Sequence, residues 1–583
     1  MSNITNAASG AKSSQLPAAI KSGGRHVRRF TADLSATGEP ALWGFGGALA
    51  IGIILISGFL FIIAWNGFTT FWPKPIEMVT LNTGSKLAGE PTRAGEYRVG
   101  DDLLTRLTET QKAQVIASNR VSNRTLYKTA NFDLYGDDFK WVSDFEVAST
   151  SLPKEFFLFE RQQWGTFVGM VDHFVVDGKK SEFNLNQLYK EQKLARERFA
   201  EIRRIDQKEI GTVNHYLNKE RLNIRRAELR YGKDSAEAQK IKDTTEIKIK
   251  KLEQDYSVLQ KKVNDVRADD RKTRIVMKEV NGRTVDVELS QIVRFYPAND
   301  LSWFDKIGIY LSRWVEFLTT EPREANTQGG VLPAIFGTVA MTLLMVIFVA
   351  PFGVITALYL REYAKQGRLV SIVRISVNNL AGVPSIVYGV FGLGFFAYTL
   401  GGSIDALFYS ENLPSPTFGT GGILWASLTL ALLTVPVVIV ATEEALSSVP
   451  RSMREGSLAC GASKWQTIRY VVLPKALPGV MTGMILAMAR GAGEVAPLML
   501  VGVVKLAPAL PIDGFFPFIH FERSFMHLGF HIFDVGFQSR NSEAGKPMVF
   551  VTTLLLLGLI VMMSSTAIYL RNRLKRRYAG SQF

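Results

Sequence analysis

Two charged residues stand in an otherwise apolar stretch near the C-terminus. Arg490 and Glu494 are four positions apart, so a helix would place them on one face, where they could form an ion pair. A charge inside a membrane span is costly unless it is paired or reached by water. The pair could therefore line an anion pathway, with Arg490 attracting the anion and Glu494 holding the arginine or shaping a gate. The alternative is a structural ion pair that ties helices together. We favour the pathway because a positive charge suits an anion.

A second stretch, from Glu443 to Pro478, separates two apolar runs and has the composition of a docking element. It contains helix-forming segments on either side of Gly461 and leaves through Leu473-Pro474. Glycine accepts the positive φ of a helix C-terminus, and the residue before a proline rarely stays helical. We therefore expect short helices over 454–464 and 463–470, the second ended by Pro474. They would present side chains to a soluble partner, and an ordinary ordered loop is the alternative.

Other kinds of chemistry have little support. His527 and His531 are spaced as helical metal ligands would be, with His520 nearby, but no carboxylate joins them at ligand spacing and we expect no metal site. The single cysteine, Cys460, excludes an intrachain disulfide. No Gly-x-x-x-x-Gly-Lys-Ser/Thr motif occurs, so this chain lacks a P-loop. We expect no catalytic residue and no bound cofactor, and any ATP that is used would be bound by another subunit.

The elements that would position these residues are membrane-spanning helices. The chain has 583 residues, of which 47% are apolar, and they gather in runs too long and too free of charge for a soluble core. The first run, Trp43 to Trp65, is long enough to cross a bilayer and too long for a cleaved signal peptide. Further spans are expected at about 331–360, 376–400, 421–441, 476–505 and 547–570.

The distribution of basic residues predicts the orientation of these spans. Lys and Arg gather before the first span and after the second, fourth and sixth, which places both termini and the 443–478 stretch in the cytoplasm. Residues 67–300, called the insert below, would then lie outside the cytoplasm, in the periplasm of a Gram-negative cell. The net charge of +15 fits this asymmetry better than it fits nucleic-acid binding. Residues 1–40 are rich in Ser, Ala and Gly and are expected to be disordered.

The insert contains two regions with different sequence patterns. Residues 74–183 contain short strand-like pieces, whereas 190–270 are highly charged with apolar residues at a/d spacing, which predicts an antiparallel helical hairpin. The hairpin is expected to be a solvated arm, with partner contact as the alternative. Asn281-Gly282 lies between alternating apolar residues and predicts a β-hairpin. Residues 301–320 are expected to form an amphipathic helix in the membrane interface.

The 443–478 stretch resembles the EAA loop by which permeases of ABC importers contact their ATPases. The Glu, Gly, Leu and Pro of that loop stand at matching spacings, while Gly456-Ser457 replaces Ala-Ala and Val471 replaces Ile. Glycine within a helix costs roughly 1 kcal/mol relative to alanine, so the first helix would be weakened here. The ATPase-coupling residues that the resemblance implies are Arg454, Glu455, Gly456, Ser457, Gly461, Ala462, Leu473 and Pro474.

Three further stretches narrow the resemblance. Residues 358–364, 380–389 and 490–497 are similar to the PstA-type permease subunit of the phosphate-specific ABC importer, and the resemblance covers about residues 325–575. It implies a type I importer permease core and a phosphate pathway in which Arg490 attracts the substrate. It implies little about residues 1–320, apart from a likeness to an extension found on a subgroup of these permeases.

The expected fold is a mainly α membrane protein with six transmembrane helices and an extracytoplasmic α+β insert that carries a long helical hairpin. The expected function is that of a non-catalytic permease subunit of an ATP-driven phosphate importer in a bacterial inner membrane. Its partners would be a second permease similar to PstC, two ATPases similar to PstB, a periplasmic phosphate-binding protein similar to PstS, and membrane lipid, with no nucleic acid. The alternatives are a permease for another anion or small solute, and a membrane-anchored sensor or scaffold that acts through its insert.

The expected segments are 1–40, 41–66, 67–300 with its hairpin at about 190–270, 301–320, and 325–575 with its coupling loop at 442–475.

Overall fold

The structure is a computed structural model that describes residues 40–105, 107–181, 184–507, 510–539 and 542–579. The chain divides into two compact units, Met1–Leu60 and Phe61–Phe583. Residues 1–39, and with them nearly all of the segment expected to be disordered, lie outside the described residues. The described part of the first unit is helical and belongs to α1, Pro40–Thr69, which continues into the second unit.

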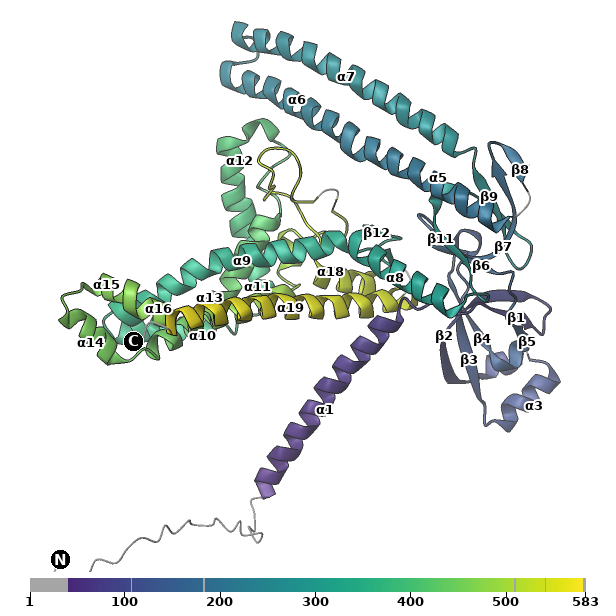
Figure 1. Cartoon of the computed structure of the whole chain (residues 1–583), viewed down its shortest axis with the longest axis horizontal. Helices are drawn as coiled ribbons and strands as arrows, with labels where there is room; N and C mark the ends of the chain where they lie inside the picture. The colour runs from purple at the N-terminus through teal and green to yellow at the C-terminus, as the bar shows by residue number, and fades with distance from the viewer. Residues whose placement is uncertain (1–39, 106, 182–183, 508–509, 540–541, 580–583) are drawn as a thin grey trace, which may run out of the picture. The chain divides into compact units, whose positions relative to one another are not determined.

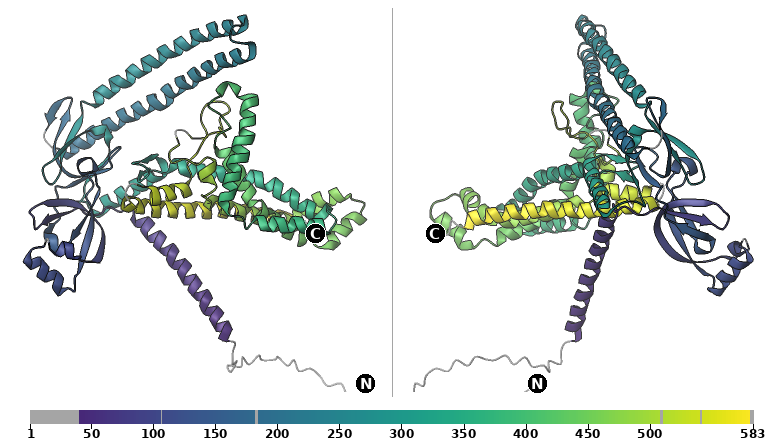
Figure 2. Two further views of the ribbon diagram at one scale, coloured as in Figure 1. Left: turned by 180° about the vertical axis from the view of Figure 1, so that it is seen from behind. Right: turned by 45° about the vertical axis from the view of Figure 1, so that its right-hand side comes forward.

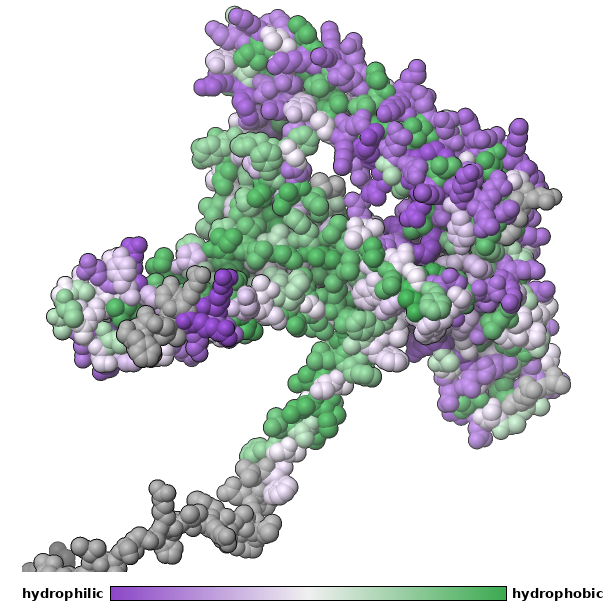
Figure 3. Space-filling model, viewed as in Figure 1, coloured by the Kyte–Doolittle hydropathy of each residue, from purple (hydrophilic) through white to green (hydrophobic). Residues whose placement is uncertain are grey.

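Six helices of the described residues are long and apolar enough to cross a membrane, which confirms the predicted number. Their exposed side chains are mostly apolar. On α9, for example, Ile347, Phe352 and Ile355 are 63%, 64% and 65% exposed, as expected where a helix meets lipid tails. The space-filling view shows this apolar surface over the membrane helices, and a hydrophilic surface over the strands and the long hairpin of the insert (Figure 3). The six helices are Trp43–Thr69, Leu332–Tyr363, Ser385–Phe408, Ile423–Ser447, Lys464–Gly493 and Ser542–Arg576.

The third span begins later than predicted. The predicted range 376–400 is interrupted, because α10 (Arg368–Leu380) ends before Pro384 and α11 (Ser385–Phe391) begins after it. Proline has no backbone N–H and disfavours a helical residue before it, which favours a break in the helix at this point. The helix that can span a membrane therefore starts at Ser385 and includes η5 (Gly392–Gly401) and α12 (Gly402–Phe408).

Two antiparallel sheets form the β-rich part of the insert (Figure 1). The first has the order β4-β3-β2-β1-β5, and the second has the order β10-β9-β7-β6-β11 with β8 paired to β7. β9 and β10 are the hairpin predicted around Asn281-Gly282, where Gly282 has a φ of +92° that glycine adopts without strain. Phe159, Phe167 and Leu188 are fully buried in the core between the second sheet and α5. The strands are β1 (Glu77–Leu81), β2 (Lys86–Arg98), β3 (Val121–Lys128), β4 (Phe139–Ser143), β5 (Val147–Ser151), β6 (Phe157–Arg161), β7 (Thr166–Val176), β8 (Lys179–Ser181), β9 (Arg274–Lys278), β10 (Thr284–Glu288) and β11 (Ile292–Pro297), with the short helices α2 (Asp101–Leu104), α3 (Glu109–Ala117) and α4 (Phe132–Tyr135) between them.

The long helical hairpin of residues 185–270, called the arm below, confirms the prediction (Figure 2). α5 (Leu185–Arg203) continues through a π-helical turn into α6 (Gly211–Tyr231), and α7 (Ala236–Asp270) runs back beside them. The chain reverses at Gly232, which has a φ of +89°. Ile202, Ile205 and Val263 are buried between the helices, so a narrow apolar seam holds two otherwise charged surfaces together.

A buried cluster of charges joins the second sheet to α8 (Trp303–Thr319). Glu160 on β6 accepts hydrogen bonds from Arg313 of α8 at 2.6 Å and pairs with Arg294 of β11. On the same helix, Glu316 pairs with Arg294 at 2.9 Å and also with Arg323. Burial opposes ionisation of Glu160, but Arg313 and Arg294 outweigh it and hold the pKa of Glu160 below its usual value. The cluster fixes the sheet to the helix that leads into the second span.

Replacing Glu160 by glutamine should destabilise this junction by about 3–5 kcal/mol, because Arg313 and Arg294 would lose the carboxylate that they share. Hydrogen–deuterium exchange of the full chain would show the loss as faster exchange in β6 and β11. The matched control is Glu155→Gln, since Glu155 is exposed at the start of the same strand pair. Equal exchange protection in the two variants would contradict the prediction.

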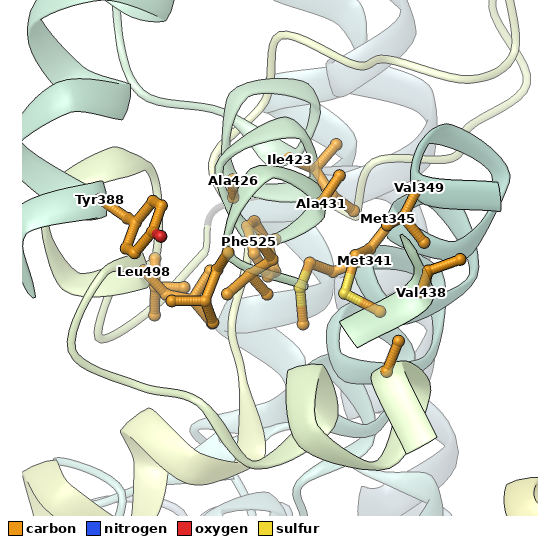
Figure 4. Close-up of a cluster of buried hydrophobic side chains, with 14 residues drawn as sticks. Met341, Met345, Val349, Tyr388, Ile423, Ala426, Ala431, Val438, Leu498 and Phe525 are labelled. Atoms are coloured by element: carbon orange, nitrogen blue, oxygen red, sulfur yellow. The ribbon is translucent and has the colours of Figure 1, made fainter. Parts of the chain in front are cut away.

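The core of the C-terminal part, residues 325–579, is built by α9 (Leu332–Leu358) and α13 (Ile423–Ser447). Met341 and Met345 of α9 pack in one cluster with Val438 of α13 and with Phe525 from the segment before the last span (Figure 4). The backbones come close together at one point, because a Cβ on Gly337 would lie 2.0 Å from the Met526 carbonyl oxygen. The remaining elements are β12 (Pro322–Arg323), β13 (Gln328–Gly329), η4 (Tyr359–Tyr363), η6 (Ser410–Asn412), α14 (Arg451–Ala459), α15 (Lys464–Thr467), η7 (Ile468–Val472), α16 (Leu473–Gly493), α17 (Leu498–Val501), α18 (Leu528–Phe533), η8 (Asp534–Gln538) and α19 (Ser542–Ala579).

Candidate functional site

Arg490 and Glu494 form the predicted ion pair, but they do not share a helix. α16 ends at Gly493, and Glu494 follows it in an extended conformation with φ −79° and ψ 133°. The arginine Nε nevertheless lies 3.5 Å from the glutamate Oε1, and the side chains are 36% and 23% exposed. The predicted fifth span is present, but its helix, Lys464–Gly493, ends earlier than the predicted range of 476–505. Glycine at 493 and the missing N–H of Pro497 explain why the helix stops where it does.

Close packing decides which way Arg490 faces. Ala487 and Gly491 lie on the buried face of α16, and a Cβ on Gly491 would lie 2.4 Å from Met345 Sδ of α9. Arg490 is therefore on the half-exposed side of the helix. The turn that follows α16 packs closely against α11. A Cβ on Gly389 of α11 would lie only 2.7 Å from Pro497 Cα, so the two backbones are in close contact. Glycines in α11 and α16 thus place one charged pair at the accessible surface of an apolar bundle.

The predicted coupling stretch begins with α14, which contains Arg454, Glu455, Gly456 and Ser457. The helix ends in a Schellman motif: the Gly461 N–H donates to the Leu458 carbonyl at 2.9 Å and the Ala462 N–H to the Ser457 carbonyl at 3.2 Å. Gly461 has a φ of +84°, as the sequence predicted for this position. Ser457 and Thr467 are hydrogen-bonded at 3.0 Å between their hydroxyls, which joins α14 to the helix that follows.

Arg454 anchors α14 to the ends of two membrane helices. Its guanidinium donates to the carbonyls of Val449 at 2.6 Å and Leu446 at 2.7 Å, just beyond and within α13, and to the Glu362 carboxylate at 2.9 Å. The Arg454 and Glu362 side chains are only 19% and 13% exposed. Arg454 therefore holds α14 against the ends of these two membrane helices. Glu362 belongs to the 358–364 stretch singled out in the sequence, but its partnership with Arg454 has no sequence signal.

The second half of the coupling stretch differs from the prediction. Ser463 and Gln466 form a capping box that starts α15, as expected at a helix N-terminus. The helix then passes through the π-helical turn η7 into α16, which begins at Leu473-Pro474 and runs on to Gly493. Pro474 therefore lies at the start of α16 and ends no helix. Proline is tolerated in a first turn, where its missing N–H removes no required bond, and the preceding π-turn allows the register to change.

The outer surface of α14, α15 and the π-helical turn η7 is exposed. Glu455 and Gly456 are exposed, and nothing lies within 4 Å of a Cβ built on Gly456. Leu458, Trp465 and Tyr470 are 48%, 55% and 67% exposed. Apolar and aromatic side chains on a polar helical surface are typical of a protein contact. Trp465 and Tyr470 were not among the predicted residues, although large aromatic side chains beside the motif could have identified them.

His527 and His531 are buried within the C-terminal part. His527 begins α18, and its Nδ1 accepts a hydrogen bond from the Gly529 N–H at 3.1 Å. Within the described residues, no group of three or more potential ligand side chains gathers around either histidine. His520 lies apart from them, between Asp513 at 2.9 Å and Glu522 at 3.0 Å.

The arm contacts two loops of the C-terminal part. Arg226 of α6 donates to Glu411 of η6 from both Nε and Nη2, with a distance of 3.0 Å from Nε. Burial opposes ionisation of Glu411, but Arg226 outweighs it and lowers the pKa of this carboxyl from its usual value. The His215 ring stacks on Phe515, with ring centres 3.9 Å apart and planes at 11°. The expected solvated arm is thus held at two points along one side.

Replacing Arg226 by glutamine should weaken the docking of the arm by roughly 1–3 kcal/mol, because Glu411 is only 4% exposed and would lose a charged donor. Faster hydrogen exchange in α6 and η6 of the full chain would reveal the change. Arg225→Gln is the matched control, since Arg225 is exposed on the same helix and forms no ion pair with any residue the structure describes. The prediction fails if both variants exchange alike.

Comparison with known proteins relates the C-terminal part of the chain to a protein family. Residues 349–576 match the family described as binding-protein-dependent transport system inner membrane component. The probable ABC transporter permease protein YqgH of Bacillus subtilis (strain 168) is 37% identical over 205 residues, which are 34% of this chain and 62% of that protein. The phosphate transport system permease protein PstA 1 of Mycobacterium tuberculosis (strain CDC 1551 / Oshkosh) is 39% identical over 175 residues, 30% of this chain and 52% of that protein.

Among solved structures, an inward-facing MetNI methionine ABC transporter aligns with 42% of this chain and 95% of its own, at 19% identity and a TM-score of 0.32. The chain spans less than two thirds of the length of the two curated relatives above. The predicted resemblance to PstA-type permeases is confirmed for the C-terminal part of the chain. The mainly α membrane fold with a β-containing insert is confirmed as well.

Proposed function

On the premise that residues 349–576 are an ABC permease domain of the PstA type, we propose that the chain is the non-catalytic permease subunit of an ATP-driven phosphate importer. The observation that carries the proposal is the Arg490–Glu494 pair, placed on the half-exposed side of an otherwise apolar bundle. The Mycobacterium tuberculosis relative is named as a permease protein of a phosphate transport system. A cation at an accessible surface of the span is what an anionic substrate requires.

Arg490 attracts phosphate, and Glu494 limits how tightly it is held. At 3.5 Å the two groups are close enough for strong attraction, yet part of the guanidinium remains accessible. A permease has to release its substrate, so a cation shared with a carboxylate suits passage better than a free cation does. A second permease, similar to PstC, would close the other side of the pathway.

The α14–α15 pair is the contact for the ATPases. Glu455, Gly456 and the apolar side chains Leu458 and Trp465 lie on its exposed surface. Arg454 fixes α14 to α9 and α13, and α15 is continuous with α16, so a movement of the pair is carried directly to the helix that bears Arg490. Two ATPase subunits similar to PstB would supply ATP hydrolysis, since the sequence has no P-loop. This chain itself would bind no cofactor.

The basic residues that follow the second, fourth and sixth spans support a cytoplasmic position for the α14–α15 pair and a position on the opposite side for the insert. A phosphate-binding protein similar to PstS would deliver substrate on the side of the insert. The two loops around Glu411 and Phe515 would lie on the same side, because they contact the arm of the insert. The arm is thus placed to hold the outer loops while the cytoplasmic pair moves.

The decisive experiment measures transport by the assembled complex in proteoliposomes. The purified chain is combined with its partner permease, ATPases and binding protein, and uptake of radiolabelled phosphate, sulfate and molybdate is compared with and without ATP. ATP-dependent uptake of phosphate alone is the expected result. Preferential uptake of another anion would assign the pathway to that substrate, and the absence of any uptake by an intact complex would overturn the proposal.

A further inference from the structure

A cavity of about 400 Å³ lies where the base of the arm meets α8. Four arginines line it: Arg196 and Arg203 from α5, Arg294 from β11, and Arg323 just after α8. The described carboxylates on its wall, Glu316 and Glu321, are fewer than the arginines. The cavity is therefore positively charged, and it lies well away from the Arg490 site.

The arginines are held in place, but they keep unused hydrogen-bond donors. Arg294 is fixed by Glu160, by Glu316 and by the Ser312 hydroxyl at 2.9 Å, and Arg203 donates to Glu321 at 2.6 Å. The side chain of Arg196 forms no ion pair or hydrogen bond with any other residue that the structure describes. Since a guanidinium has five N–H donors in a rigid fork, Arg196 and Arg203 can turn several of them to an anion in the cavity.

An apolar strip leads away from the same cavity. Val315, on the cavity wall, is 61% exposed, and it shares one face of α8 with Phe304, Leu311 and Leu318. The strip continues into the second span, because the Leu332 N–H at the start of α9 donates to the Thr320 carbonyl at 3.2 Å. Leu332 itself is 39% exposed, and exposed apolar residues follow along α9. The polar cavity and the apolar strip therefore adjoin each other at Val315.

We propose that this cavity binds the headgroup of an anionic phospholipid, with its acyl chains along α8. The phosphodiester provides the oxygens that arginine forks recognise, and the acyl chains cover the apolar side chains that would otherwise face water. A free inorganic phosphate would leave the strip on α8 uncovered. The site would join the insert to the membrane at the helix that carries the buried Glu160–Arg313 cluster. The proposal does not depend on which solute the permease carries.

Native mass spectrometry of the purified, delipidated full chain tests the site, with phosphatidylglycerol as the anionic probe and phosphatidylethanolamine as the zwitterionic one. The variant replaces the two cavity arginines of α5, Arg196→Gln with Arg203→Gln. The matched control is Arg204→Gln with Arg221→Gln, which removes the same charge from the arm outside the cavity. Because two cations are removed from the headgroup site, the cavity variant should bind phosphatidylglycerol roughly tenfold more weakly than the control.

Three results would overturn the proposal. Equal affinity of the cavity variant and the control for phosphatidylglycerol would show that the arginines hold no headgroup. Equal binding of phosphatidylglycerol and phosphatidylethanolamine by the unaltered chain would reduce the site to its apolar strip. Displacement of bound phosphatidylglycerol by millimolar inorganic phosphate would assign the cavity to a free anion. Circular dichroism of both variants, expected to match the unaltered chain, confirms that the comparison is between folded proteins.

Discussion

Replacing Arg490 by glutamine should lower phosphate uptake by the reconstituted complex roughly 10- to 100-fold, while the complex still assembles. The charged hydrogen bonds that an arginine gives to an anion contribute roughly 1.5–3 kcal/mol, and each 1.4 kcal/mol is about a factor of ten. Glutamine keeps much of the length but removes the charge. The exposed Arg573, on α19, provides a matched control, and Arg573→Gln should transport as the unaltered chain does.

A double variant separates a substrate role from a structural one. In Arg490→Gln alone, Glu494 is left as an unpaired charge, so reduced assembly would be ambiguous. Arg490→Gln combined with Glu494→Gln removes both charges and relieves that cost. A structural ion pair predicts that the double variant recovers assembly and uptake together. A pathway arginine predicts recovered assembly without recovered uptake, and normal uptake by the double variant would exclude the pathway role.

The features that the sequence predicted correctly are those that depend on local chemistry. Long apolar runs with few charges predicted six spans because length and hydropathy alone determine whether a helix can cross a bilayer. Gly461 was predicted to end a helix because few residues other than glycine accept its φ of +84°. Asn281-Gly282 predicted its hairpin for the same kind of reason. In each case neighbouring residues set the conformation, so no knowledge of the tertiary structure was needed.

The features that the sequence did not predict depend on packing between distant segments. Arg490 and Glu494 were placed on one helix, yet α16 ends between them, and their pairing depends on the turn before Pro497. Pro474 was expected to end a helix, yet a preceding π-turn lets the helix continue. The contact of Arg226 with Glu411 joins residues 185 positions apart. No periodicity or motif encodes such a contact, because either side chain alone would be an ordinary surface charge.

Replacing Gly461 by valine should abolish ATP-dependent uptake while the altered chain still inserts into the membrane. Nothing lies within 4 Å of a Cβ built at Gly461, so the substitution meets no steric clash with its surroundings. The cost comes from the backbone: a β-branched residue at a φ of +84° is strongly disfavoured, by at least about 1–2 kcal/mol. The Schellman bonds of Gly461 and Ala462 should break, and α14 should lose its fixed angle to α15.

Gly456→Ala is the matched control for that variant, because a Cβ at Gly456 also meets open space but the backbone there is helical. It should stabilise α14 by up to about 1 kcal/mol and leave coupling intact. The two variants therefore add side chains at exposed glycines five positions apart and differ in the backbone conformation that each glycine adopts. Co-purification of the ATPases and phosphate-stimulated ATP hydrolysis measure the coupling directly. If Gly461→Val keeps both at the level of Gly456→Ala, then the angle between α14 and α15 does not transmit the motion, and coupling has to be assigned to the surface of α14 alone.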